Sequence, residues 1–107
     1  SLFLLAKKED RTMNENVFQR KVIQRLKSEF PECIVMKQDA TYKQGIPDLV
    51  IFHHDKYAML ECKKSATASH QPQQDYYISK IKKWAYASFI YPENVDQVFR
   101  ELKEVFV

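Results

Sequence analysis

The chain has 107 residues, of which 45% are hydrophobic and 29% are charged. This length fits one small domain, and the composition excludes an intrinsically disordered chain, because a disordered chain contains too few apolar residues to form a core. The formal net charge of +3 allows a polyanionic partner without requiring one, since most such surpluses belong to a solvated surface.

The N-terminal part of the chain predicts an extension followed by a helix. Residues 1–12 show no clear pattern, and we expect an extension, native or artificially added, before a single domain over residues 13–107. Between residues 14 and 30, apolar side chains recur at the spacing of an amphipathic helix, which Pro31 ends. The apolar positions of this helix are Phe18, Val22, Ile23, Leu26 and Phe30.

Three short apolar runs then predict strands, at residues 33–36, 49–52 and 57–60. The last two runs are joined by a short polar link over residues 53–56, which is typical of an antiparallel hairpin. The turn-like segment 39–47 precedes the hairpin and contains the only glycine of the chain, Gly45. We expect Gly45 to supply a positive φ or room for a close approach of the backbone.

The remaining residues predict a helix, a strand and a last helix. Pro72 suits the first turn of a helix that runs to about residue 86, and a strand follows at residues 88–91. Asn94 is expected to cap the last helix, with Gln97 completing a capping box. The order α-β-β-β-α-β-α predicts an α/β fold in which helices flank a mixed β-sheet.

The two cysteines, Cys33 and Cys62, are too few for a disulfide scaffold and form no Cys-x-x-Cys pair. Each lies in an apolar, strand-like run, so we expect buried free thiols and therefore a reducing, cytoplasmic environment. The apolar segment 2–6 is too short to span a bilayer and lacks the basic segment of a signal peptide.

Three polar residues at the ends of the predicted hairpin strands point to chemistry. In an antiparallel hairpin the start of one strand lies beside the end of the other, so Asp48, Glu61 and Lys63 should converge. Strand alternation places Glu61 and Lys63 on one face and Cys62 on the other. Taken singly, such residues often only face water, but two carboxylates and an ammonium together can hold a hard divalent cation beside a phosphate.

The same residues resemble the motif of the PD-(D/E)XK nuclease superfamily, which matches Pro47-Asp48 and Glu61-Cys62-Lys63. The segment from Gly45 to Leu49 is similar to the strand opening of VRR-Nuc domains and of small phage endonucleases that resemble Holliday-junction resolvases. The resemblance covers residues 14–107 and implies a restriction-endonuclease-like fold. It also implies a Mg²⁺- or Mn²⁺-dependent DNA endonuclease, with branched, flap or junction DNA as the narrower expectation.

The resemblance assigns roles to these residues. Asp48, Glu61 and the backbone carbonyl of Cys62 would bind the metal ion, so the side chain of Cys62 can vary. Lys63 would orient or deprotonate the attacking water and stabilise charge in the transition state.

Two further candidates come from the helices. Glu15, on the inward face of the first helix, would add a metal ligand or contact a metal-bound water, although its spacing from Thr12 also fits a capping box. Gln74 carries an amide on an otherwise apolar helical stripe and would lie near the metal, although it also fits an exposed position in a glutamine-rich turn.

Several residues outside this group also have functional alternatives. Lysines are placed to meet DNA phosphates in a sequence-independent way, namely Lys43, Lys64, Lys80 and Lys83. Tyr76 and Trp84 could stack on bases, whereas helical spacing favours Tyr77 as a core residue. The functional alternatives for His53 and His54 are a second metal site or general bases, but both residues lie at the far end of both strands and are expected to be ordinary turn residues.

DNA is therefore the expected partner, and a homodimer or membership in a larger replication or recombination assembly is expected because two strand cuts need two sites. A bacterial or phage-infected cell is the expected setting, from the resemblance alone. The competing interpretations are a non-catalytic nucleic-acid-binding or assembly module on the same fold, and an RNA-processing enzyme. The intact Asp48, Glu61 and Lys63 argue against the first, and the distance of the histidines from Lys63 argues against the second.

Overall fold

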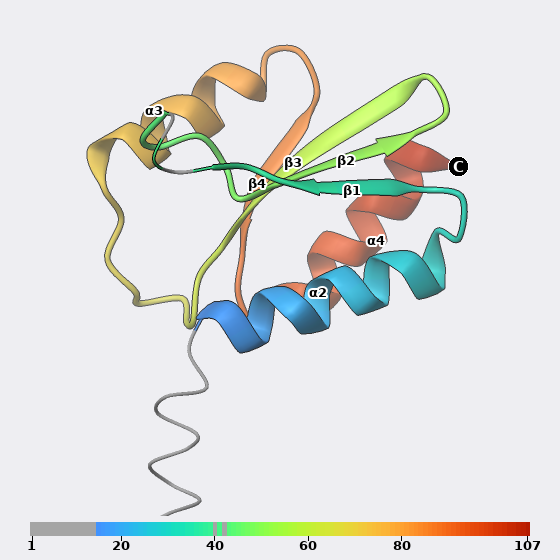
Figure 1. The fold of residues 1–107 in the computed structure, drawn as a ribbon, viewed down its shortest axis with the longest axis horizontal. Helices are drawn as coiled ribbons and strands as arrows, with labels where there is room; N and C mark the ends of the chain where they lie inside the picture. The colour runs from blue at the N-terminus through green and yellow to red at the C-terminus, as the bar shows by residue number, and fades with distance from the viewer. Residues whose placement is uncertain (1–14, 40, 42) are drawn as a thin grey trace, which may run out of the picture.

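The structure is a computed structural model that describes residues 15–39, 41 and 43–107. In these residues a four-stranded sheet is combined with three helices (Figure 1). The strands are β1 (Ile34–Lys37), β2 (Leu49–His53), β3 (Lys56–Cys62) and β4 (Tyr86–Ile90). The helices are α2 (Glu15–Glu29), α3 (Pro72–Ile81) and α4 (Val95–Phe106). The predicted order α-β-β-β-α-β-α is confirmed, whereas the predicted extension over residues 1–12 lies outside the described residues.

The sheet is mixed, as predicted, with the spatial order β1-β2-β3-β4. The first three strands are antiparallel, and β4 runs parallel to β3. Strands β2 and β3 form the predicted hairpin, in which Leu49 pairs with Leu60 and His53 pairs with Lys56. His54 has a φ of 58° in the turn of this hairpin. This register places the start of β2 beside the end of β3, so Asp48 and Glu61 lie at the same end of the hairpin.

The main core lies between the sheet and helices α2 and α4, which cover one of its faces (Figure 1). The apolar stripe of α2 supplies the buried Val22, Leu26 and Phe30, while Phe18 and Ile23 pack at its margin. Every second residue of the hairpin strands points into this core, as period-two alternation requires. These strand residues are Leu49, Ile51, Ala58, Leu60 and Cys62. Because Cys62 faces the core, its neighbours Glu61 and Lys63 face the other side of the sheet.

Helix α3 covers part of that other face, above β3 and β4 in Figure 1. Ile78 and Ile81 of α3 are buried against Ala87 of β4, with Met59 and Tyr77 packed at the edge. The predicted inward position of Tyr77 is therefore confirmed. None of the helices in the described residues is long and apolar enough to cross a membrane.

Helix α3 ends earlier than predicted, at Ile81 instead of about residue 86. The backbone N–H of Trp84 donates to the carbonyl of Ile81 (2.8 Å), which closes a turn. Tyr86 then pairs with Ala58 of β3 and starts β4, two residues before the predicted strand. Residues 86–90 therefore pair with the central strand β3 instead of continuing the helix. Tertiary contacts of this kind commonly override helix propensity, and no local sequence pattern indicates them.

The predicted capping box of α4 is wrong, because the Asn94 side chain makes no cap hydrogen bond. The Asn94 amide instead donates to the Phe89 carbonyl (3.1 Å), and its oxygen accepts from the Tyr91 N–H (2.8 Å). Gln97 donates to Glu101 within the helix (3.4 Å). The Asn94 side chain therefore ties the end of β4 to the start of α4. Both cysteines are free thiols as predicted; Cys62 is buried, but Cys33 is only half-buried.

Candidate active site

Asp48 and Glu61 lie side by side where β2 begins and β3 ends. The backbone N–H of Asp48 donates to Oε1 of Glu61 (3.1 Å). In return, the backbone N–H of Cys62 donates to Oδ2 of Asp48 (3.0 Å). Each carboxylate is thus held by the backbone of the opposite strand, so the convergence that the hairpin predicted is present.

Lys63 is buried beside this pair, and Gln74 of α3 connects the two. The Lys63 ammonium donates to Oε1 of Gln74 (2.7 Å) and to the backbone carbonyl of Ser69 (3.1 Å). The Gln74 amide nitrogen donates to Oε2 of Glu61 (3.1 Å). An amide suits this position because it accepts from a cation on one side and donates to a carboxylate on the other. Gln74 is half-buried and bound to the site, and is not the exposed turn residue that was the alternative.

Gln74 also helps to begin its helix, because its Oε1 accepts from the backbone N–H of Gln71 (3.0 Å). The same oxygen therefore serves the helix start and the Lys63 ammonium. This double use fixes the side chain and couples the position of α3 to the end of β3.

Gly45 sets the approach of the chain to Asp48. Its φ is +88°, and a Cβ at this position would lie 2.3 Å from the Cβ of Gln73. Gly45 therefore supplies both of the features that were offered as alternatives from the sequence, a positive φ and a close approach. The two residues before β2 are also fixed in position. Pro47 is fully buried, and the Asp48 carbonyl accepts from the Gln38 N–H (2.8 Å).

The two carboxyl groups share a buried, negatively charged setting. Only 4% of Glu61 is exposed, and this burial together with the charge of Asp48 raises the pKa of Glu61 to about 8. Burial also raises the pKa of Asp48, although the hydrogen bond from the Cys62 N–H lowers it in part. The Lys63 ammonium acts in the opposite direction and lowers the pKa of both carboxyls. A bound cation would relieve the same repulsion, and carboxylate oxygens are the donors that hard divalent cations prefer.

Glu15 is the first residue of α2 and lies close enough to act on the site electrostatically. Its charge contributes to raising the pKa of Asp48 and of Cys62. Figure 1 shows the start of α2 next to the segment that follows β3. The alternative capping box of Glu15 involves Thr12, which lies outside the described residues.

The lysines expected to contact phosphates are all exposed, but they do not lie together at the carboxylates. Lys64 directly follows Lys63, at the edge of the site. Lys43 lies over the Tyr77 ring, with its ammonium 5.7 Å from the ring centroid. Lys80 and Lys83 line the outer face of α3.

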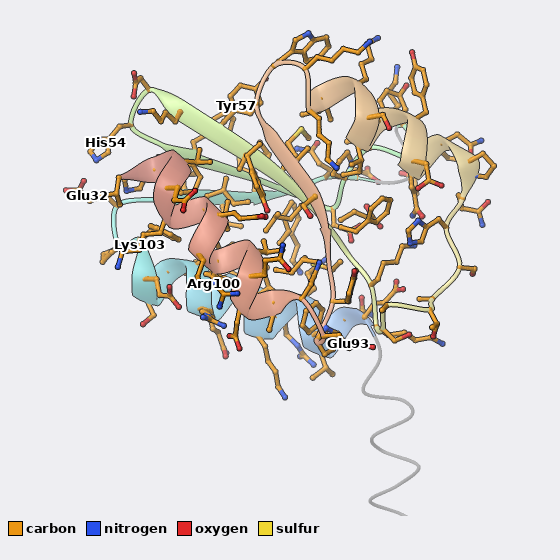
Figure 2. The ribbon with its side chains drawn as sticks, turned by 180° about the vertical axis from the view of Figure 1, so that it is seen from behind. Glu32, His54, Tyr57, Glu93, Arg100 and Lys103 are labelled. Atoms are coloured by element: carbon orange, nitrogen blue, oxygen red, sulfur yellow. The ribbon has the colours of Figure 1, made fainter. Side chains whose placement is uncertain are left out.

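The histidines lie at the opposite end of the hairpin, as predicted, but sequence reasoning missed their neighbour Glu32. Ligand atoms of Glu32, His53 and His54 lie within 4.8 Å of one another. Nε2 of His54 is 2.7 Å from the Glu32 carboxylate, and Figure 2 shows these two side chains next to each other. Among the described residues, Nδ1 of His53 is buried without a hydrogen-bond partner. Glu32 lies here because β1, which follows it, pairs with β2. This pairing joins distant segments, so no local sequence pattern predicts the position of Glu32.

Sequence reasoning also missed Ser69, whose backbone carbonyl accepts from Lys63. Because any residue offers a carbonyl, no residue-type pattern could have identified this contact. The loop that carries Ser69 is also held by the next residue, His70, which bonds to Asp75 (3.0 Å) and stacks on Phe89.

Comparison with known proteins gives the following results. No protein-family model matches the chain, and no curated protein matches its sequence. A solved structure described as a VRR_NUC domain protein has a TM-score of 0.65 and 20% sequence identity to this chain. The match covers 85% of this chain and 88% of that chain. The shared fold confirms the predicted α/β class, in which helices flank a mixed β-sheet.

Proposed function

We propose that this chain is a metal-dependent nuclease that hydrolyses phosphodiester bonds of DNA. One observation carries the proposal: Asp48, Glu61 and Lys63 converge at one end of the sheet, and Gln74 links the lysine to a carboxylate. The fold shared with a VRR_NUC domain protein supports it.

The oxygens of Asp48 and Glu61 would hold Mg²⁺ or Mn²⁺, together with the backbone carbonyl of Cys62. Glu15 would complete the site from α2, either as a ligand or through a water molecule. When bound, the ion supplies Lewis-acid polarisation of the scissile phosphate and a lower pKa for the attacking water. The donors fit such an ion because they are hard oxygen ligands, and because the carboxylates are buried together with raised pKa values.

Lys63 would act on the attacking water and on the phosphate. Its described acceptors are the uncharged Gln74 amide and Ser69 carbonyl, so neither partner neutralises the ammonium. A positive charge fixed in a buried position can stabilise the extra negative charge of the transition state. Gln74 would keep the ammonium and the Glu61 carboxylate in place relative to each other.

Narrower properties of the nuclease are also proposals. We propose specificity for branched, flap or junction DNA, and action as a homodimer or within a larger replication or recombination assembly. We further propose the cytoplasm of a bacterial or phage-infected cell as its location. The exposed lysines Lys43, Lys64, Lys80 and Lys83 would provide sequence-independent affinity for phosphates.

The test is cleavage of end-labelled linear duplex, single-stranded and four-way-junction DNA in Mg²⁺, Mn²⁺ or EDTA. Asp48→Asn, Glu61→Gln and Lys63→Met are each expected to lower cleavage at least ~10³-fold, because each removes charge stabilisation made in the transition state. Circular dichroism should show that each variant is folded.

The matched control is Glu32→Gln, which removes a carboxylate from the cluster with His53 and His54 and should leave cleavage unchanged. Cleavage that survives EDTA, or that persists in Glu61→Gln, would contradict the metal mechanism. DNA binding without cleavage under every metal condition would instead favour the non-catalytic module.

A further inference from the structure

The outer face of α3 carries aromatic rings and lysines that neither the core nor the carboxylate site uses. Tyr76 is 57% exposed, and Trp84, in the turn after the helix, is 64% exposed. The ammonium of Lys80 lies 5.7 Å from the Tyr76 ring centroid and 5.9 Å from the Trp84 ring centroid. We call Tyr76, Lys80, Lys83 and Trp84 the α3 outer face.

This face contains a preformed groove. An open groove of about 560 Å³ is lined by Pro72, Asp75, Tyr76, Ser79, Lys80 and Lys83. Two of these six residues are lysines, and the acidic one, Asp75, is paired with Nδ1 of His70 (3.0 Å). The groove therefore offers positive charge next to exposed π surface.

We propose that the α3 outer face binds an unpaired strand of DNA next to the nuclease site, an inference that rests on the proposed function. Exposed aromatic rings stack on bases of any sequence, and lysines between them attract the phosphates of the same strand. Inside a duplex the faces of the bases are already stacked on one another, so Tyr76 and Trp84 have no partners there. The face therefore favours a single strand over a duplex.

The chemistry of the face argues against a protein partner as its occupant. Protein interfaces are enriched in aromatic residues but depleted of lysine at their cores. Here Lys80 lies between the two exposed rings, in the position that would become the centre of such an interface. A polyanion with flat rings matches both components of the face.

The α3 outer face lies on the same helix as Gln74, which contacts the carboxylate site. Gln74 of α3 points to Glu61 and Lys63, and Tyr76 begins the exposed face two residues later. One short helix thus presents one side to the carboxylates and the other to solvent. A strand stacked on Tyr76 would lead toward the carboxylates past the start of α3, which suits a flap or the arm of a branched substrate.

The test measures binding without cleavage, using the full chain with Asp48→Asn in EDTA. Trp84 is the only tryptophan in the chain, so its intrinsic fluorescence reports directly on the face. Titration with a 12-nucleotide oligo(dT) is expected to quench this fluorescence, whereas a 12-base-pair duplex is not. A fluorescein-labelled oligo(dT) gives the affinity of each variant by anisotropy.

Tyr76→Ala and Trp84→Ala should each weaken oligo(dT) binding roughly 5- to 150-fold, which corresponds to ~1–3 kcal/mol per stacked base. Trp84→Phe should retain most of the affinity, because a phenyl ring still stacks. Lys80→Glu should weaken binding and reduce its dependence on salt.

Two matched controls lie elsewhere. Phe52 is an exposed aromatic at the hairpin end of β2, and Arg100 lies on α4, on the side of the sheet opposite α3 (Figure 2). Phe52→Ala and Arg100→Glu should change oligo(dT) binding less than about 2-fold. Absence of quenching, equal losses for duplex DNA, or losses as large in the controls would overturn the inference.

The oligo(dT) titration and the cleavage assay test the single-strand site and the nuclease separately. If the native chain cleaves duplex DNA in Mg²⁺ but the oligo(dT) titration fails, the nuclease stands and the single-strand site is refuted. If oligo(dT) binds as expected but no substrate is cleaved in any metal, the single-strand site stands and the nuclease is refuted.

Discussion

Gly45 and Gln73 lie so close that a Cβ added to Gly45 would be 2.3 Å from the Cβ of Gln73 and 2.7 Å from its backbone carbon. This contact joins the segment before Asp48 to the first turn of α3. Asp48 follows Gly45 by three residues and Gln74 directly follows Gln73, so this contact helps to set the distance between the carboxylate end of the hairpin and the helix that contacts Lys63.

Gly45→Ala is therefore expected to destabilise the fold by about 2 kcal/mol or more. The substitution adds the strain of a positive φ to a steric clash that a packed backbone cannot relieve cheaply. Urea denaturation measures the loss. Gln44→Ala, at an exposed neighbouring position, should remain within about 0.5 kcal/mol of the native chain. A Gly45→Ala chain of native stability would contradict this close packing.

Gln74→Ala is expected to lower cleavage about 10- to 100-fold while the chain stays folded. Loss of this amide removes a partner from Lys63 and from Glu61, and supporting hydrogen bonds around metal ligands commonly have effects of this size. The Mn²⁺ concentration that gives half-maximal cleavage should rise as well. Gln73→Ala is the matched control, since it keeps the Cβ near Gly45 and should leave both quantities unchanged.

The stability of the metal-free protein should fall as the pH rises from about 5.5 to 8. Because burial and Asp48 raise the pKa of Glu61 from 4.5 to about 8, the folded state retains a proton that the unfolded chain has already lost. Unfolding then releases a proton, so higher pH favours the unfolded state. Burial raises the pKa of Asp48 as well, so this carboxyl contributes to the pH dependence in the same direction. Thermal melts in EDTA should show a loss of at least ~1 kcal/mol, or ~4 °C in Tm.

Mg²⁺ or Mn²⁺ should raise Tm more at pH 8 than at pH 5.5, because protons compete with the ion for the same oxygens. Glu61→Gln removes the titrating group but keeps every histidine, so its Tm should depend less on pH and on metal. A Glu61→Gln melt with the native pH dependence would assign the effect to other groups.

Cys62→Ala should retain cleavage and lose about 1–2 kcal/mol of stability. The thiol is buried in the main core, whereas the contact with Asp48 comes from the backbone N–H, which the substitution keeps. Burial also raises the pKa of the Cys62 thiol, so iodoacetamide should modify it more slowly than the half-buried Cys33. Loss of cleavage in a folded Cys62→Ala chain would give the side chain a role that its position does not explain.

Much of this molecule follows from local patterns in its sequence. Helical spacing predicted α2 and its buried Val22 and Leu26, and the polar link at residues 53–56 predicted the hairpin. Alternation along β3 then required Glu61 and Lys63 to share a face opposite Cys62. These features depend on geometry that repeats within a few residues, so they are visible in the sequence.

Other features depend on which surfaces meet in the folded chain, and the tertiary structure alone decided them. Pairing of Tyr86 with Ala58 stopped α3 early, and the Asn94 side chain turned back to β4 instead of capping α4. The bridge from Lys63 through Gln74 to Glu61, and the cluster of Glu32 with His54, join segments that the sequence keeps apart. The sequence determined which segments form strands and helices and which candidate site residues these segments carry. The packing of distant segments determined the partners of those residues, because a contact between distant segments leaves no periodic pattern in the sequence.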